Sequence, residues 1–135
     1  MTENELTGEI IGAAIEVHRI LGPGLLEHVY EECLTQELEL RRIPFVRQRR
    51  VRVEYKGRPV AADLKIDLLV DDRIIVELKS IEQLLPVHGA QLLTYLRLTG
   101  KQLGLLINFN VPVLHNGVQR VVHRLPKLCV SASLR

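Results

Sequence analysis

The sequence predicts an α/β protein with a mixed central sheet, in which two helices precede the first strand. A strand, helix, strand pattern over residues 74–109 is typical of a parallel crossover, because parallel strands need a long connection. The segment before it, residues 45–70, alternates apolar and polar residues and is typical of an antiparallel hairpin. Parallel and antiparallel pairs in one chain make the sheet mixed.

Helical spacing of apolar residues predicts a first helix over residues 6–21, and LGPG at 21–24 ends it. A second helix is expected over about residues 25–42, with Tyr30 in its buried stripe. Pro86 and Gly100 mark the limits of a third helix, since proline is favoured in the first turn and glycine after the last.

The remaining apolar segments are expected to be strands. The hairpin over residues 45–70 turns at Lys56-Gly57, and the next strand covers Ile74 to Lys79. LGLLINFN, residues 103–110, is almost wholly apolar, which indicates a strand covered on both faces. GVQRVVHRL, from residue 117, adds a last strand. We expect residues 1–135 to form a single domain.

Composition and charge limit the classes of function. Of 135 residues, 47% are apolar and 25% charged, which is typical of a soluble globular chain. The net charge of +2 is too small to indicate nucleic-acid binding by itself. The acidic N-terminus is unlike a signal peptide, and no segment has membrane-spanning length. Cys33 and Cys129 match no metal-ligand spacing, so we expect a cytoplasmic protein with no membrane partner.

The stretch KIDLLVDDRIIVELKS, residues 65–80, places charged side chains inside two apolar runs. An unpaired carboxylate in an apolar sheet is costly, so such groups are usually paired or bound to a metal. Glu77 and Lys79 face the same side of their strand, because side chains alternate. The register of the preceding strand decides whether Asp67 joins them, since a slip of one residue reverses its side.

Two registers are open. A loop of residues 71–72 would place Asp67 opposite Val76, on the face away from Glu77. A loop of residues 71–73 would place Asp67 opposite Glu77. The apolar residues do not distinguish these registers, since both faces of both strands are apolar. We favour the longer loop, because two facing carboxylates are suited to hold Mg²⁺, which takes one or two carboxylates plus water.

A simpler interpretation of Glu77 and Lys79 is an exposed edge strand that carries a common Glu-x-Lys pair. Two observations favour a site instead. The pair lies in the most apolar hairpin of the chain, and Asp67 precedes Glu77 by ten positions. In such a site Lys79 would orient water or stabilise a developing oxyanion.

Asp67, followed on the next strand by Glu77-Leu78-Lys79, resembles the signature of the PD-(D/E)XK nuclease superfamily. QLLTY, from Gln91 to Tyr95, resembles the Gln-x-x-x-Tyr element of its RecB-like exonuclease branch. Ile66 stands before Asp67, where the superfamily name has a proline, but that position is loose across the superfamily.

A second motif is more specific. GLLEHVY, with Gly24, Glu27 and Tyr30, is similar to the motif that names the GxxExxY family, and the flanking segments agree. The resemblance covers roughly residues 10–125. It implies a restriction-endonuclease-like α-β-β-β-α-β core with an extra N-terminal helix. It also implies a metal-dependent nuclease that hydrolyses phosphodiester bonds in nucleic acid, with DNA favoured.

The resemblance also implies roles for individual residues. The catalytic set it implies consists of Glu27, Asp67, Glu77, Lys79 and Gln91. Asp67 and Glu77, with help from Glu27, would bind Mg²⁺, for which Mn²⁺ can substitute. Tyr95 would contact the substrate. Apart from the resemblance, we expect His88, which lies near these motifs, to contact a phosphate of the substrate.

Alternatives stay open at this point. Glu27 could serve its helix dipole, which favours an acid in the first turn. The chain could be a catalytically silent nucleic-acid-binding or scaffolding module, or a nuclease subunit that needs a partner, although the intact Asp67, Glu77 and Lys79 argue against a silent module. The small size is compatible with a homodimer or a partner protein. Eight Lys or Arg over residues 41–58 either follow a phosphate backbone or form a solvated face.

Overall fold

The computed structural model describes residues 1–124, so Cys129 lies outside the described residues. The helices are α1 (Glu3–Leu21), α2 (Glu27–Leu40) and α3 (Pro86–Thr99), with a short 3₁₀ turn, η1 (Leu114–Gly117). The strands are β1 (Phe45–Val51), β2 (Glu54–Tyr55), β3 (Arg58–Pro59), β4 (Leu64–Val70), β5 (Ile74–Lys79), β6 (Leu103–Asn108) and β7 (Val118–Val122). Within residues 1–124, no helix combines the length and apolar character needed to cross a membrane.

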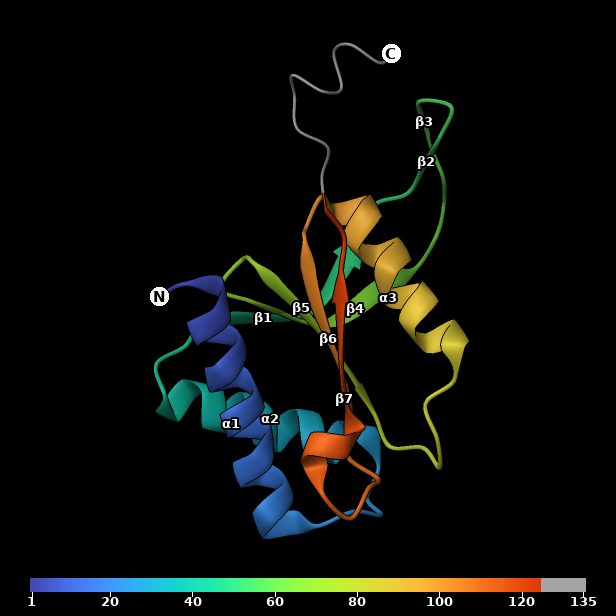
Figure 1. Cartoon of the computed structure of the whole chain (residues 1–135). Helices are drawn as coiled ribbons and strands as arrows, with labels where there is room; N and C mark the ends of the chain where they lie inside the picture. The colour runs from blue at the N-terminus through green and yellow to red at the C-terminus, as the bar shows by residue number, and fades with distance from the viewer. Residues whose placement is uncertain (125–135) are drawn as a thin grey trace.

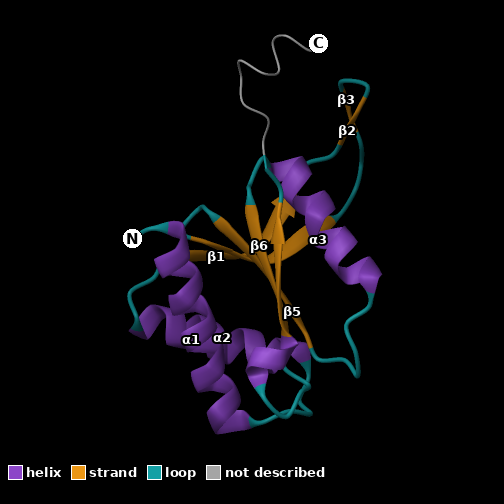
Figure 2. Ribbon diagram, viewed as in Figure 1, coloured by secondary structure: helices purple, strands orange, loops and turns teal. Residues whose placement is uncertain are grey.

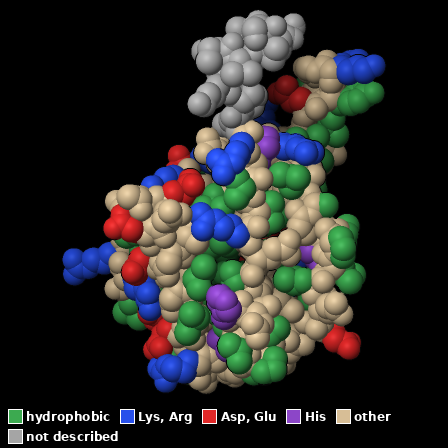
Figure 3. Space-filling model, in the orientation of Figure 1, with side chains coloured by type: hydrophobic (Ala, Val, Ile, Leu, Met, Phe, Trp, Pro, Cys, Tyr) green, Lys and Arg blue, Asp and Glu red, His purple; other side chains and the backbone are tan. Residues whose placement is uncertain are grey.

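Five strands form one mixed sheet, in the order β1-β4-β5-β6-β7 (Figure 1). Its β5–β6 pair is parallel and is connected by α3, whereas the other neighbouring pairs are antiparallel. This arrangement confirms the predicted fold class, the mixed sheet and the helix that precedes the α-β-β-β-α-β core. β2 and β3 pair separately, at the end of an arm that projects from the body and carries Lys and Arg side chains (Figures 1 and 3).

Helices cover both faces of the sheet (Figure 2). α1 and α2 pack on one face, in a core that includes Leu68, Val76 and Leu105. α3 packs on the other face, where Leu92 and Leu96 join a second core. β6 is buried along its whole length, as expected for a strand covered on both sides.

The turn between β4 and β5 settles the register. Val70 pairs with Ile74, which leaves a loop of residues 71–73 and confirms the longer of the two loops considered above. Asp71 and Asp72 adopt positive φ angles of 52° and 55°, a conformation that aspartate tolerates better than most residues. The pairing continues to Leu68 and Val76, so the next residues along, Asp67 and Glu77, face each other. The shorter-loop alternative is therefore wrong.

Two helix starts differ from the expected positions. α1 begins at Glu3, earlier than predicted, because the Thr2 side chain accepts from the Glu5 amide while the Glu5 carboxylate accepts from the Thr2 amide. α2 begins at Glu27, later than predicted, because the preceding loop is held by Tyr30.

The Tyr30 hydroxyl fixes the loop between α1 and α2. It donates to the Gly22 carbonyl over 2.6 Å and accepts from the Leu25 amide over 3.2 Å. The Tyr30 ring is fully buried and stacks on Phe109, with ring centroids 4.3 Å apart. Tyr30 therefore joins the loop, α2 and the segment after β6.

We expect Tyr30→Phe to lower the free energy of unfolding by about 1–3 kcal/mol, because the ring still packs while a buried carbonyl and an amide lose their partner. Urea denaturation followed by circular dichroism measures the change. The matched control is Tyr55→Phe, whose side chain is exposed, and it should change stability little. Equal stability of Tyr30→Phe and wild type would contradict a structural role for the hydroxyl.

Candidate active site

Two carboxylates face each other where β4 and β5 separate. The Asp67 amide donates to Glu77 Oε2 over 2.7 Å, and the Leu78 amide donates to Asp67 Oδ2 over 2.8 Å. The carboxylates thus act as acceptors where the backbone pairing of the two strands ends. Each carboxylate uses one oxygen in these bonds, so the pair presents two acidic groups side by side.

Burial and mutual repulsion dominate the electrostatics of this pair. Glu77 is 8% exposed, and burial, followed by the negative charge of Asp67, raises the pKa of its carboxyl to about 8. Burial also raises the pKa of the half-buried Asp67, against the hydrogen bond from the Leu78 amide. The positive charge of Lys79 opposes both shifts. A cation beside the two acids would therefore stabilise their ionised forms.

Lys79 lies on the same side of β5 as Glu77, two residues along the strand. That side faces α3, because Ile75, at the next alternate position, packs in the core that α3 covers. The Lys79 carbonyl accepts from the Phe109 amide over 2.9 Å, which ties the end of β5 to the segment after β6. Asp67, Glu77 and Lys79 thus share one face, as the longer loop predicts.

α3 brings a phenol and an amide next to the acids. Tyr95 is buried, and burial, followed by the negative charge of Glu77, raises the pKa of its hydroxyl. Gln91 is exposed and donates from Nε2 to the Tyr95 hydroxyl over 3.1 Å. The predicted shared face of Gln91 and Tyr95 is therefore present, and it lies toward the acidic pair.

His88 has a local structural contact. Its Nδ1 accepts from the Leu85 amide over 2.9 Å and so caps the first turn of α3. Since Nδ1 is used in this bond, only Nε2 of His88 is left for the substrate, and that contact stays a prediction.

Glu27 is exposed and is the first residue of α2. Its charge raises the pKa of both Asp67 and Glu77, so it lies near the pair. Within residues 1–124, however, no three His, Cys, Asp or Glu side chains are arranged to hold a metal ion together. The structure therefore brings Asp67 and Glu77 together, while the participation of Glu27 in a metal site stays a prediction.

The donor set suits a hard divalent cation. The facing side chains offer carboxylate oxygens, the ligands that Mg²⁺ prefers, and Mg²⁺ commonly uses one or two carboxylates with water in its other positions. A divalent charge would also offset the repulsion that raises the pKa of Glu77.

Asn108, which is not among the predicted site residues, holds the loop after Lys79. Asn108 is 2% exposed; its side chain accepts from the Ile81 amide over 3.1 Å and donates to the Ile81 carbonyl over 3.0 Å. The Ser80 hydroxyl also donates to the Leu25 carbonyl, just before α2. A polar residue at the end of an otherwise apolar strand was the signal in the sequence.

Gln48 was also missed. It lies across from Asp67 on β1, between the pairs Arg47–Leu68 and Arg49–Ile66. Its φ of 48° is unusual for a strand, and its amide donates to Glu31 over 2.9 Å. A hydrogen bond from Gln48 lowers the pKa of Asp67.

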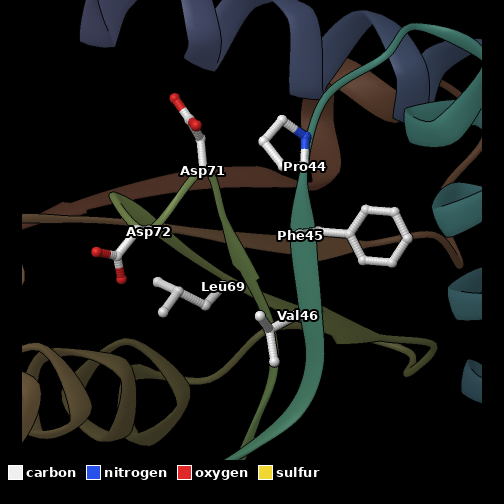
Figure 4. A pocket seen from close by; sticks show the side chains of 6 residues that line it. All are labelled: Pro44, Phe45, Val46, Leu69, Asp71 and Asp72. Atoms are coloured by element: carbon white, nitrogen blue, oxygen red, sulfur yellow. The ribbon is translucent and has the colours of Figure 1, made fainter.

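A pocket of about 310 Å³ lies beside the β4–β5 turn, and neither Asp67 nor Glu77 lines it (Figure 4). Its lining consists of Pro44, Phe45, Val46, Leu69, Asp71 and Asp72. Asp71 pairs with Arg73 over 2.6 Å and Asp72 pairs with Lys101 over 3.2 Å, so both of its acids are already compensated. This pocket is not the carboxylate site.

The raised pKa of Glu77 predicts a pH dependence of stability without metal. The folded chain keeps a proton that the unfolded chain releases above about pH 4.5, so the free energy of unfolding should fall as pH rises from 4.5 to about 8. In EDTA, Glu77→Gln should lose less stability over this window than wild type, by on the order of 2 kcal/mol. Urea denaturation at several pH values measures the difference.

Glu82→Gln, at an exposed position, is the control and should follow wild type. Parallel curves for Glu77→Gln and wild type would contradict the raised pKa.

Comparison with known proteins agrees with this geometry. A family model described as the PD-(D/E)XK nuclease superfamily matches residues 4–121, a range that contains the facing acids, Lys79 and the Gln91–Tyr95 pair. No curated protein and no solved structure gives a match. The family model covers nearly all of the described residues, and the mixed sheet is the one that the resemblance implies. This chain therefore belongs to the PD-(D/E)XK nuclease superfamily.

Proposed function

We propose that this chain is a metal-dependent nuclease that hydrolyses phosphodiester bonds in DNA. The observation that carries the proposal is the placement of Asp67 opposite Glu77, with Lys79 on the same face of the sheet. Membership of a nuclease superfamily supports the same reaction class. The acids, the lysine and the α3 side chains together offer ligands, a positive charge and hydrogen-bond donors for a phosphodiester.

Asp67 and Glu77 are the proposed ligands of Mg²⁺, with Glu27 as a third carboxylate and Mn²⁺ as a substitute ion. When bound, Mg²⁺ supplies positive charge that acidifies water and polarises a phosphoryl oxygen. Both acids must be ionised to bind it. Lys79 favours that ionised state, since its charge lowers the pKa of both.

Lys79 is the proposed electrostatic partner of the scissile phosphate. Its ammonium group stabilises negative charge that develops on the phosphoryl oxygens. Gln91 orients water or a phosphate oxygen, and Tyr95 positions the Gln91 amide through the hydrogen bond between them. His88 offers Nε2 to a neighbouring phosphate, because its Nδ1 is used in capping α3.

The motif of Gly24, Glu27 and Tyr30 supports a place in the GxxExxY family within the superfamily. Tyr30 holds the loop that ends at Glu27, so the motif joins a packing residue to an acid near the site. A cytoplasmic location, a single domain over residues 1–135, and a second copy or partner protein for recognition complete the proposal.

Asp67→Asn should abolish metal-dependent hydrolysis, because it removes one of the two facing carboxylates. The assay uses labelled single- and double-stranded DNA and RNA with Mg²⁺, Mn²⁺ or EDTA, and calorimetry measures metal binding. Asp72→Asn, in the β4–β5 turn, is the control and should stay active. Metal-independent binding of nucleic acid by wild type, without cleavage, would favour a silent binding module.

Lys79→Ala should lower the rate of hydrolysis by about 10²-fold or more, because the charge facing the phosphate is lost. Its circular dichroism spectrum should match wild type, since Lys79 is only half-buried. Arg19→Ala removes the same charge from an exposed position on α1, where Arg19 pairs with Glu16, and should keep full activity. A folded and fully active Lys79→Ala variant would refute the role of Lys79.

A further inference from the structure

The segment between β1 and β4, residues 52–63, forms the projecting arm, which we call the basic arm (Figure 1). Its tip is an ordered two-stranded ribbon, because Tyr55 pairs with Arg58 and the Val60 amide donates to the Val53 carbonyl over 2.9 Å. Lys56 and Gly57 make its two-residue turn, with positive φ angles of 52° and 77°. The tip of the arm is therefore a preformed β-hairpin.

Positive charge is concentrated on the basic arm and the strand ends from which it rises. Residues 49–65 contain six Lys or Arg against two acids, whereas the whole chain has a net charge of only +2. The rest of the chain is thus net negative. A polyanion would therefore be attracted to the arm much more than to the rest of the surface.

These charges are available to an outside partner. Arg50 lies 3.6 Å from Asp63, and Arg52 lies 3.9 Å from Glu54, but all four side chains are more than half exposed. Ion pairs of this kind contribute little free energy, so a phosphate can replace the carboxylate at small cost.

The positive surface continues from the arm to the end of α3. A pocket of about 210 Å³ at the root of the arm is lined by Arg49, Arg50 and Arg52 on one side and by Thr99 and Lys101 on the other. The arginines at the root of the arm thus lie next to the C-terminal end of α3, the helix that carries Gln91 and Tyr95.

The arm and the acidic pair are connected by a short stretch of strand. The arm joins β4 at Leu64, three residues before Asp67, which is roughly 10 Å along the strand. The tip, Lys56 and Gly57, lies seven to eight residues before Leu64, so it is within about 36 Å of Asp67 along the chain. That reach is close to one turn of a DNA duplex.

We propose that the basic arm enters the major groove of double-stranded DNA while the backbone of the same duplex lies beside Asp67 and Glu77. The inference rests on the proposed nuclease function and names its substrate class. The major groove of B-form DNA admits a two-stranded β-ribbon, whereas the deep, narrow major groove of A-form RNA does not. Tyr55, which is 66% exposed at the tip, presents a hydroxyl to base edges.

The test compares two double variants that remove equal charge. Lys56→Gln with Arg58→Gln alters the tip of the arm, and Arg19→Gln with Arg120→Gln alters α1 and β7; all four positions are exposed. Binding is measured in EDTA, which prevents metal-dependent cleavage, at several salt concentrations. The ligands are a labelled DNA duplex two helical turns long, the same sequence as single-stranded DNA, and the matching RNA duplex.

The arm variant should bind the DNA duplex about tenfold more weakly. The slope of log K against the logarithm of the salt concentration should become shallower by about 2, one unit for each lost phosphate contact. Its binding to single-stranded DNA and to the RNA duplex should change much less. The control variant should bind all three ligands as wild type does. Circular dichroism confirms that both variants are folded.

Equal losses in the arm and control variants would overturn the inference, because charge alone would then explain binding. Equal losses of the arm variant on all three ligands would overturn the groove contact. Cleavage of the DNA duplex by wild type with Mg²⁺ is measured separately. If binding depends on the arm but wild type does not cleave, the proposed nuclease function is wrong and the role of the arm stands. If wild type cleaves but binding does not depend on the arm, the role of the arm is wrong and the nuclease function stands.

Discussion

The reciprocal hydrogen bonds between Asp67, Glu77 and the backbone are the constraint on which the site depends. Where two strands separate inside a protein, their amides lose their partners, and a buried amide without an acceptor is costly. Here each carboxylate supplies an acceptor to an amide on or beside the other acid. The amides, in turn, give the buried carboxylates donors. The same bonds that end the strand pair therefore hold the acids in place, close enough that the negative charge of Asp67 adds to burial in raising the pKa of Glu77.

The helices are positioned around this pair by a small number of polar contacts. Tyr30 fixes the loop before α2, and its ring stacks on Phe109, directly after β6. The Ser80 hydroxyl and the Asn108 side chain tie the end of β5 to α2 and to β6. These contacts join the beginning of α2 to the carboxyl ends of the two parallel strands. Ligands outside carboxyl strand ends are a common arrangement in sheets of this kind.

Most of the fold could be predicted because it follows from local patterns. Period-two alternation located the hairpin strands, and Pro86 and Gly100 located α3. The register of β4 against β5 was predicted from a chemical requirement. Apolar residues on both faces did not distinguish the two registers, whereas a metal site requires two acids that face each other. Membership of the PD-(D/E)XK nuclease superfamily, predicted from motifs, is confirmed over residues 4–121.

What could not be predicted depends on contacts between distant segments. The late start of α2 follows from the Tyr30 hydroxyl, and the positive φ of Gln48 has no signal in a segment rich in arginine. The position of Glu27 relative to the acids depends on how α2 docks, which no spacing encodes. The contact by which His88 caps the first turn of α3 likewise could not be predicted from the sequence pattern.

β1 is an edge strand of the sheet, and its free side has a consequence for the behaviour of the chain at high concentration. An open strand edge can pair with the same edge of another molecule and so begin aggregation. Arg49 and Arg50 are exposed along this edge, and the repulsion between two such rows opposes that pairing. Because salt screens this repulsion, the protection should be weakest in concentrated electrolyte. The arginines that attract a polyanion thus also oppose edge-to-edge pairing of two β1 strands.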